Sequence, residues 1–181
     1  METKNEVSTR VSSFPGTNEE NRSKNQGDHV IPFDRNRVIL TPDGLRPHST
    51  YINASFIEGY HNDESFVITQ DPLAATAEDF WRMVTEHKIR TMVRLSDDSD
   101  GFLYYPETLN SGDGLTFSEF GSMRVSLDGP VEEKPGYVAR DLTVYNGKAD
   151  ESVKLTHFAI KKWGPPTNSD LPESTQVCVK K

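Results

Sequence analysis

Cysteine, long apolar runs and clustered positive charge are all scarce in this 181-residue sequence. The single cysteine, Cys178, excludes an internal disulfide and a CxxC-type metal site, and it fits a reducing compartment. No apolar run approaches the roughly 18 residues that a membrane-spanning helix requires. Lys and Arg number 20 against 28 Asp and Glu, so the net charge is −8, and no basic cluster is present. These features argue against a nucleic-acid partner and against direct membrane insertion.

The apolar residues that are present concentrate in the middle of the chain. Residues 1–29 hold only four of them, and residues 164–181 hold another four. The first residues also lack the apolar region of a secretory signal peptide. We therefore predict a mostly disordered polar linker over residues 1–29, a folded segment over residues 30–172 and a polar tail over residues 173–181.

Periodic patterns in the folded segment predict one clear helix and several short strands. Ala77, Phe80, Trp81 and Val84 form one apolar helical stripe, with Thr76 before it as the expected N-cap. Strands are expected at residues 51–60, 65–70, 89–95, 137–145 and 153–160, with 115–120 as a further candidate. Because no regular βαβ alternation is visible, we predict a mixed α/β or α+β fold with a largely antiparallel or mixed sheet.

Few residues indicate chemistry by themselves. His157 shares an alternating strand face with Val153 and Leu155, and we interpret it as a hydrogen-bonded strand histidine rather than a catalytic base. The acidic run at residues 97–100 lacks the glycine and terminal glutamate of a calcium loop, which favours a solvated turn. Cys178 has no neighbouring base, so we do not expect it to act as a nucleophile. No metal and no cofactor are expected.

Six segments, in order along the chain, resemble the protein tyrosine phosphatase domain. They are residues 21–25 (NRSKN), 30–38 (VIPFDRNRV), 50–60 (TYINASFIEGY), 68–73 (ITQDPL), 78–83 (EDFWRM) and 156–163 (THFAIKKW). The resemblance implies that family's twisted mixed sheet flanked by helices, with the C-terminal part missing. In detail the chain is most similar to the second, membrane-distal domain of receptor-type phosphatases of the gamma/zeta class. In such receptors that domain is generally a pseudophosphatase.

The catalytic groups of the resembling family are lacking in this sequence. Phosphotyrosine hydrolysis there uses a low-pKa cysteine thiolate and a phosphate-binding arginine in an HCxxGxxR loop, and an Asp that protonates the leaving group. The 181 residues contain no HCxxGxxR loop. In the segment that resembles the acid loop, Trp163 is followed by Gly164 and Pro165, where the family has Pro and Asp. We therefore expect no catalytic residue and a degenerate acid loop.

Three further departures from the family affect substrate binding and packing. In the segment that resembles the phosphotyrosine-recognition loop, Lys24 and Asn25 are followed by Gln26 and Gly27, so no tyrosine ring is present. Asp71 replaces the glycine of the TQGPL turn. Tyr105 stands for the usual tryptophan before proline. The recognition loop is therefore expected to be degenerate as well.

The resemblance and the departures together lead to one interpretation and two alternatives. The chain is expected to be a non-catalytic regulatory or interaction module, part of a receptor-type phosphatase, in the cytoplasm or on the cytoplasmic side of the plasma membrane. Its expected partners are proteins, among them the membrane-proximal phosphatase domain of the same receptor. One alternative is an incomplete copy of an active enzyme. The other is a truncated isoform without a stable fold, in which the helix bearing Phe80 and Trp81 lacks cover.

Overall fold

The computed structural model describes residues 12–60, 65–95, 102–108, 116–161 and 175–180, the last of these as backbone. Its helices are α1 (Phe14–Thr17), α2 (Glu19–Arg22) and α3 (Ala77–Glu86). Its strands are β1 (Arg37–Ile39), β2 (Tyr51–Glu58), β3 (Ser65–Gln70), β4 (Thr91–Leu95), β5 (Thr116–Phe120), β6 (Met123–Leu127), β7 (Glu132–Glu133), β8 (Tyr137–Asn146), β9 (Glu151–Ile160) and β10 (Thr175–Lys180). The predicted strands at residues 65–70, 137–145 and 153–160 are confirmed to within two residues at each end.

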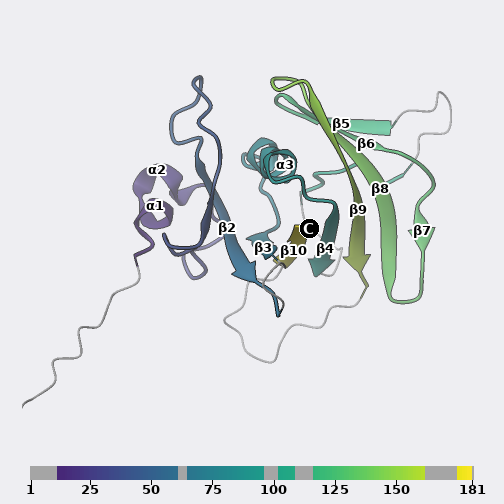
Figure 1. Ribbon diagram of the computed structural model, residues 1–181, viewed down its shortest axis with the longest axis horizontal. Helices are drawn as coiled ribbons and strands as arrows, with labels where there is room; N and C mark the ends of the chain where they lie inside the picture. The colour runs from purple at the N-terminus through teal and green to yellow at the C-terminus, as the bar shows by residue number, and fades with distance from the viewer. Residues whose placement is uncertain (1–11, 61–64, 96–101, 109–115, 162–174, 181) are drawn as a thin grey trace, which may run out of the picture.

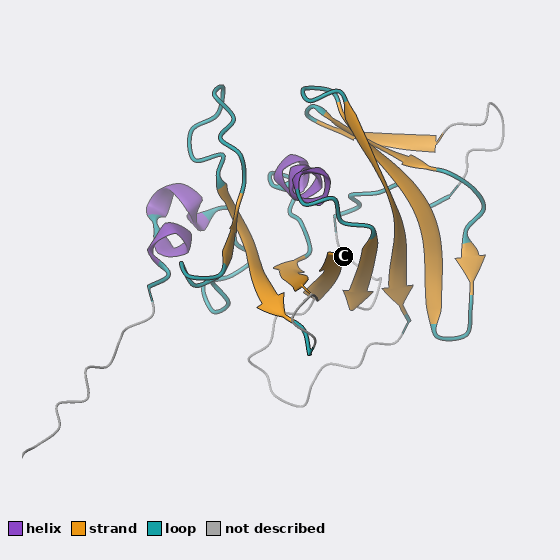
Figure 2. Ribbon diagram, in the orientation of Figure 1, coloured by secondary structure: helices purple, strands orange, loops and turns teal. Residues whose placement is uncertain are grey.

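One mixed sheet carries the described strands, which confirms the predicted fold class (Figure 1). Its order is β1-β2-β3-β10-β4-β9-β8-β6-β5, with β7 paired to β8. The β4–β9 pair is parallel, and the other pairs are antiparallel. Helix α3 packs over one face of this sheet, whereas α1 and α2 lie beside β2 (Figure 2).

An interior strand of the sheet, β10, comes from the segment predicted to be a polar tail. β10 pairs antiparallel with β3, from Thr175 opposite Gln70 to Lys180 opposite Ser65. On its other side it pairs antiparallel with β4, with Thr175 opposite Leu95. The prediction of a tail over residues 173–181 is therefore wrong for residues 175–180. A short segment has little intrinsic strand preference, and its pairing partners decide its conformation.

Helix α3 buries the apolar stripe that the sequence predicts. Phe80 and Trp81 are 1% and 0% exposed, and the indole Nε1 of Trp81 donates a hydrogen bond to the backbone oxygen of Tyr104 at 2.9 Å. The structure thus differs from the alternative of a truncated isoform in which these two side chains lack cover. Thr76 does precede the helix, but its hydroxyl accepts from the backbone N–H of Leu73 instead of capping a helical N–H.

Buried ion pairs attach the connection between β1 and β2 to helix α3. Asp79 in the first turn of the helix accepts from Arg46 of that connection and from Arg82 one turn later, each at 2.9 Å. Arg82 also donates to the backbone oxygen of Ser49 at 3.2 Å. Asp79 and Arg82 are buried, and paired charges of this kind hold their position because an unpaired partner would be costly.

The predicted linker differs from the structure over part of its length. Residues 14–22 form α1 and α2 rather than coil. A helix of four residues is too short to be stable alone, so tertiary contacts must hold both. Asn21 is buried, and its side-chain amide donates to the backbone oxygen of Pro15 at 2.9 Å. Such contacts between residues far from any apolar run leave no periodic signal in the sequence.

Replacing Val177 by proline tests the interior position of β10. Proline removes a backbone N–H from a strand that is paired on both sides, so we expect V177P to lower the free energy of unfolding by about 2–4 kcal/mol. Urea denaturation of the full chain measures this. Val177→Ile keeps the N–H and should unfold near the wild-type midpoint. An unchanged midpoint for V177P would contradict the placement of β10.

Candidate functional site

The predicted recognition loop, residues 24–27, is bound to the end of strand β3. The backbone N–H of Gln26 donates to Oε1 of Gln70 at 2.9 Å, and Nε2 of Gln70 donates back to the backbone oxygen of Lys24 at 2.9 Å. The side-chain amide of Gln26 donates to the backbone oxygen of Asp71, again at 2.9 Å. These reciprocal bonds fix the loop against the sheet.

Asn25 anchors the same loop to α1 and β2. Its Nδ2 donates to the backbone oxygen of Gly16 at 2.9 Å. Its Oδ1 accepts from the hydroxyl of Tyr51 at 2.7 Å and from Nδ2 of Asn53 at 3.1 Å. Burial raises the pKa of Tyr51 to about 12, so the phenol remains a donor at neutral pH. Both polar atoms of the Asn25 side chain are therefore hydrogen-bonded within the protein.

Lys24 directs its ammonium group toward the backbone. Its Nζ donates to the backbone oxygen of His48 at 2.5 Å and lies 6.0 Å from the ring centroid of Tyr51. His48 presents this oxygen from a left-handed conformation, with φ of 55°. Desolvation by burial lowers the pKa of Lys24. The one cation of the loop thus serves to join it to the β1–β2 connection.

Gly27 leaves open space at the end of the loop. A Cβ built on this residue meets no atom within 4 Å. Packing therefore does not impose glycine here, because a Cβ meets no neighbour.

A buried ion pair lies where β3 and β4 end. Asp71, directly after β3, accepts from Nε of Arg94 on β4 at 3.0 Å. Both residues are buried, at 7% and 6% exposure. Burial lowers the pKa of Arg94, but the attraction of the Asp71 carboxylate outweighs it, and the net shift is upward. The two side chains neutralise each other beside residues 24–27.

Sequence reasoning identified Asp71 but missed Gln70 and Arg94. Arg94 lies on the same buried face of β4 as Met92, where an apolar residue would be expected. A charged residue at this position was the signal available in the sequence. Gln70 gave no signal, because a glutamine at a strand end is common on protein surfaces. The structure brings residues 24–27 together with Gln70, Asp71 and, through Asp71, with Arg94.

Several predicted residues fall outside what the structure describes. The degenerate acid loop at Trp163, Gly164 and Pro165 lies outside the described residues, as does the acidic run at residues 97–100. Cys178 lies in β10, which is described as backbone. No group of three or more His, Cys, Asp or Glu within the described ranges is arranged to hold a metal ion.

His157 occupies the predicted strand face but not the predicted environment. It lies on the buried face of β9 with Val153 and Leu155. Neither of its ring nitrogens has a protein hydrogen-bond partner in the described part of the chain, which differs from the predicted hydrogen-bonded histidine. Burial lowers its pKa to about 3, with smaller contributions from Arg140 and Arg94. The imidazole is therefore neutral at physiological pH.

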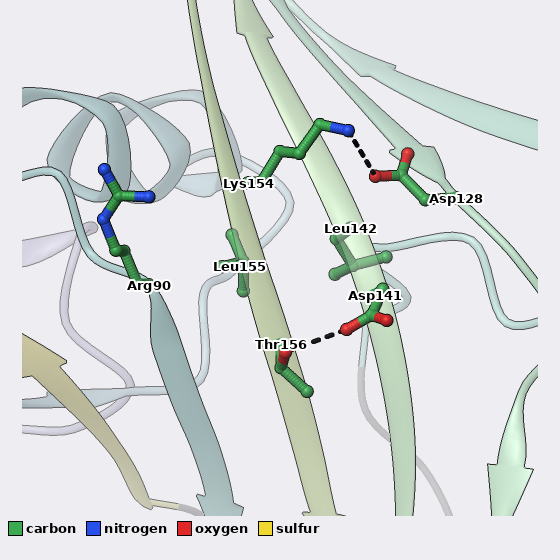
Figure 3. A pocket seen from close by; sticks show the side chains of 7 residues that line it. All are labelled: Arg90, Asp128, Asp141, Leu142, Lys154, Leu155 and Thr156. Carbon is green, nitrogen blue, oxygen red and sulfur yellow. Dashed lines mark hydrogen bonds and ion pairs between the residues drawn. The ribbon is translucent and has the colours of Figure 1, made fainter.

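A polar pocket of about 390 Å³ opens on β8 and β9 (Figure 3). Arg90, Asp128, Asp141, Leu142, Lys154, Leu155 and Thr156 line it. Lys154 lies 3.9 Å from Asp128, and Thr156 donates to Asp141 at 2.8 Å. Two strands, β10 and β4, separate β9 from β3 in the sheet. The pocket is therefore not part of the site formed by residues 24–27.

Comparison with known proteins decides the family. The family model of the protein-tyrosine phosphatases matches residues 21–180. The chain belongs to this family. The match begins within the segment predicted to be linker and includes β10, so it is wider than the predicted folded segment of residues 30–172.

Receptor-type phosphatases are among the similar proteins. Tyrosine-protein phosphatase 69D of Drosophila melanogaster is 44% identical over 158 residues, which cover 87% of this chain and 10% of that protein. Human receptor-type tyrosine-protein phosphatase alpha is 34% identical over 148 residues, 79% of this chain and 18% of that protein. The human zeta type is 32% identical over 154 residues, 81% of this chain and 6% of that protein. The chain thus spans less than one fifth of these relatives. Within the described residues, no helix is both long and apolar enough to cross a membrane.

Replacing Asp71 by asparagine tests the buried ion pair. The amide keeps the shape and an acceptor but removes the carboxylate charge that Nε of the buried Arg94 contacts, so we expect a loss of about 3 kcal/mol in unfolding free energy. Glu119→Gln is the matched control, because Glu119 pairs with Arg124 at 2.8 Å on the surface and should cost less than about 0.5 kcal/mol. Thermal and urea denaturation measure both. Equal effects of the two substitutions would contradict the role of burial.

Proposed function

We propose that this phosphatase-family chain is a pseudophosphatase: a non-catalytic regulatory or interaction module of a receptor-type protein tyrosine phosphatase. Its acid-loop segment has Gly164 and Pro165 after Trp163. Neither residue can donate the proton that a tyrosyl leaving group needs, and a general acid typically contributes about 10²–10⁴ in rate. Because these residues lie inside the chain, the loss does not depend on where the sequence stops.

The state of residues 24–27 is the observation that carries this proposal. A recognition loop must present free polar groups and an aromatic surface to its ligand. Here the side chain of Asn25 is hydrogen-bonded to Gly16, Tyr51 and Asn53. The ammonium group of Lys24 donates to the backbone oxygen of His48. No aromatic residue occurs among the four. The loop supports the fold and offers little to a phosphotyrosine.

Charge at the end of β3 supports the same conclusion. A phosphate dianion requires positive potential, and the nearest buried cation, Arg94, is paired with Asp71. The Asp71 carboxylate would also repel an approaching phosphate. An anion-binding role at this end of the sheet is therefore disfavoured.

The missing catalytic groups fit the membrane-distal domain of a receptor, which is the domain expected to be non-catalytic. A domain without catalysis can alter an active neighbour only by contacting its states unequally. The gamma/zeta class stays a prediction from the motifs, because the zeta identity of 32% is close to the alpha identity of 34% and below the 44% of the 69D protein. A place on the cytoplasmic side of the plasma membrane belongs to the same proposal.

An incomplete copy of an active phosphatase is the alternative. The chain spans 10% of the 69D protein and 18% of the alpha type, which is consistent with a longer product. Transcript sequence beyond Lys181 distinguishes the two, since an HCxxGxxR segment there would supply a nucleophile and a phosphate site. An isoform without a stable fold is the further possibility, and a cooperative thermal melt of the isolated chain would contradict it.

Hydrolysis of p-nitrophenyl phosphate tests the absence of catalysis. Cys178 is the only thiol in the chain, so Cys178→Ser removes every possible thiolate route. We expect wild type and C178S to show the same background rate, measured beside an active receptor-type catalytic domain. Turnover in the wild type that C178S loses would overturn the proposal.

Titration into an active neighbour tests the regulatory role. We expect the purified chain to bind the membrane-proximal phosphatase domain of its receptor and to change that domain's kcat/KM severalfold. Calorimetry and a phosphopeptide assay measure the two effects. An unrelated acidic protein of similar size and charge is the control. Absence of both binding and rate change would leave the chain without its proposed regulatory role.

A further inference from the structure

Two basic side chains lie next to each other on the buried face of β8 and β9, away from residues 24–27. Arg140 on β8 is the register partner of His157 on β9. Both belong to the buried face of their strands, with exposures of 8% and 0%. Register partners of an antiparallel pair have Cβ atoms about 5 Å apart, so the two side chains are direct neighbours.

Polar atoms of both residues are buried without partners. Arg140 donates from Nε to the backbone oxygen of Glu107 at 3.3 Å, and its guanidinium lies 5.2 Å from the ring centroid of Tyr105. Its Nη1 and both ring nitrogens of His157 have no hydrogen-bond partner in the described part of the chain. The Tyr105 ring also lies 4.5 Å from the His157 ring, so one aromatic ring adjoins both. Unpaired buried donors of this kind are rare and call for a missing partner.

The charge of this region is also unbalanced. Arg94 has Asp71 as its carboxylate partner, whereas Arg140 contacts no carboxylate within the described ranges. A guanidinium cannot become neutral by losing its proton, so the positive charge of Arg140 persists on burial. His157 is neutral and keeps one N–H donor, and it cannot offset the charge. Water could satisfy hydrogen bonds here but would leave the charge uncompensated.

We infer that Arg140 and His157 hold a small monovalent anion, of halide or simple carboxylate size, on the buried face of β8 and β9 beside the Tyr105 ring. The anion accepts from Nη1 of Arg140 and from the N–H of neutral His157, and it supplies the missing counter-charge. This site is structural, since it is buried beneath Tyr105, and it is independent of the proposed pseudophosphatase function. Its occupancy would stabilise the folded chain, because the unfolded chain lacks the site.

Chloride is the probe for this site. We expect the urea midpoint of the full chain to rise with chloride concentration when chloride replaces gluconate at constant ionic strength. Arg140→Met removes the charge and keeps most of the side-chain volume, so it should abolish that rise. Arg124→Met is the matched control, because Arg124 is exposed on β6 and paired with Glu119. It should keep the full chloride dependence.

Chloride NMR provides a readout that does not depend on unfolding. We expect the wild-type chain to broaden the ³⁵Cl signal, bromide to reverse the broadening, and R140M to lose it. If R140M fails to fold, His157→Phe replaces it and should reduce the broadening by removing one donor. Equal midpoints of the wild type in chloride and gluconate, or undiminished broadening in the folded variant, would overturn the inference.

Discussion

Pairing of one strand with two others holds this sheet together. Along the described sheet, β3 and β4 are joined through β10 and not to each other. The ion pair between Asp71 and Arg94 links the ends of the same two strands, so it reinforces with charge what β10 achieves with backbone hydrogen bonds. Residues 24–27 bind to Gln70 and Asp71, and their position therefore depends on the same junction.

Local periodicity accounts for the elements that the sequence predicted well. The stripe of α3 and the alternation in β8 and β9 are strong because each buries one continuous face. The sequence did not predict β6, β7, α1, α2 or β10. Each is six residues or fewer, although β3, also of six residues, was predicted. For elements this short, distant partners decide the conformation, and those partners are not visible in a local window.

The candidate site shows the same division between what is local and what is distant. The loss of an aromatic residue after Asn25 and the change to Asp71 could be recognised from the sequence alone. The partners of these residues could not, because Gln70 lies 44 residues from Gln26 and Arg94 lies 23 residues from Asp71. Degeneracy of a motif is thus readable in sequence, whereas the use that the fold makes of the altered residues is not.

The place of β10 has a consequence for the order in which the chain can fold. Ribosomes make β3 and β4 long before β10, because Thr175 follows its partner Gln70 by 105 residues. Until β10 has been made, the edges of β3 and β4 that pair with it have no partner strand. Unpaired strand edges are sites of aggregation. Closing so large a loop late also favours slow folding. The finished sheet is therefore assembled only after residues 175–180 have been synthesised, and chaperones that shield exposed strand edges would act before that point.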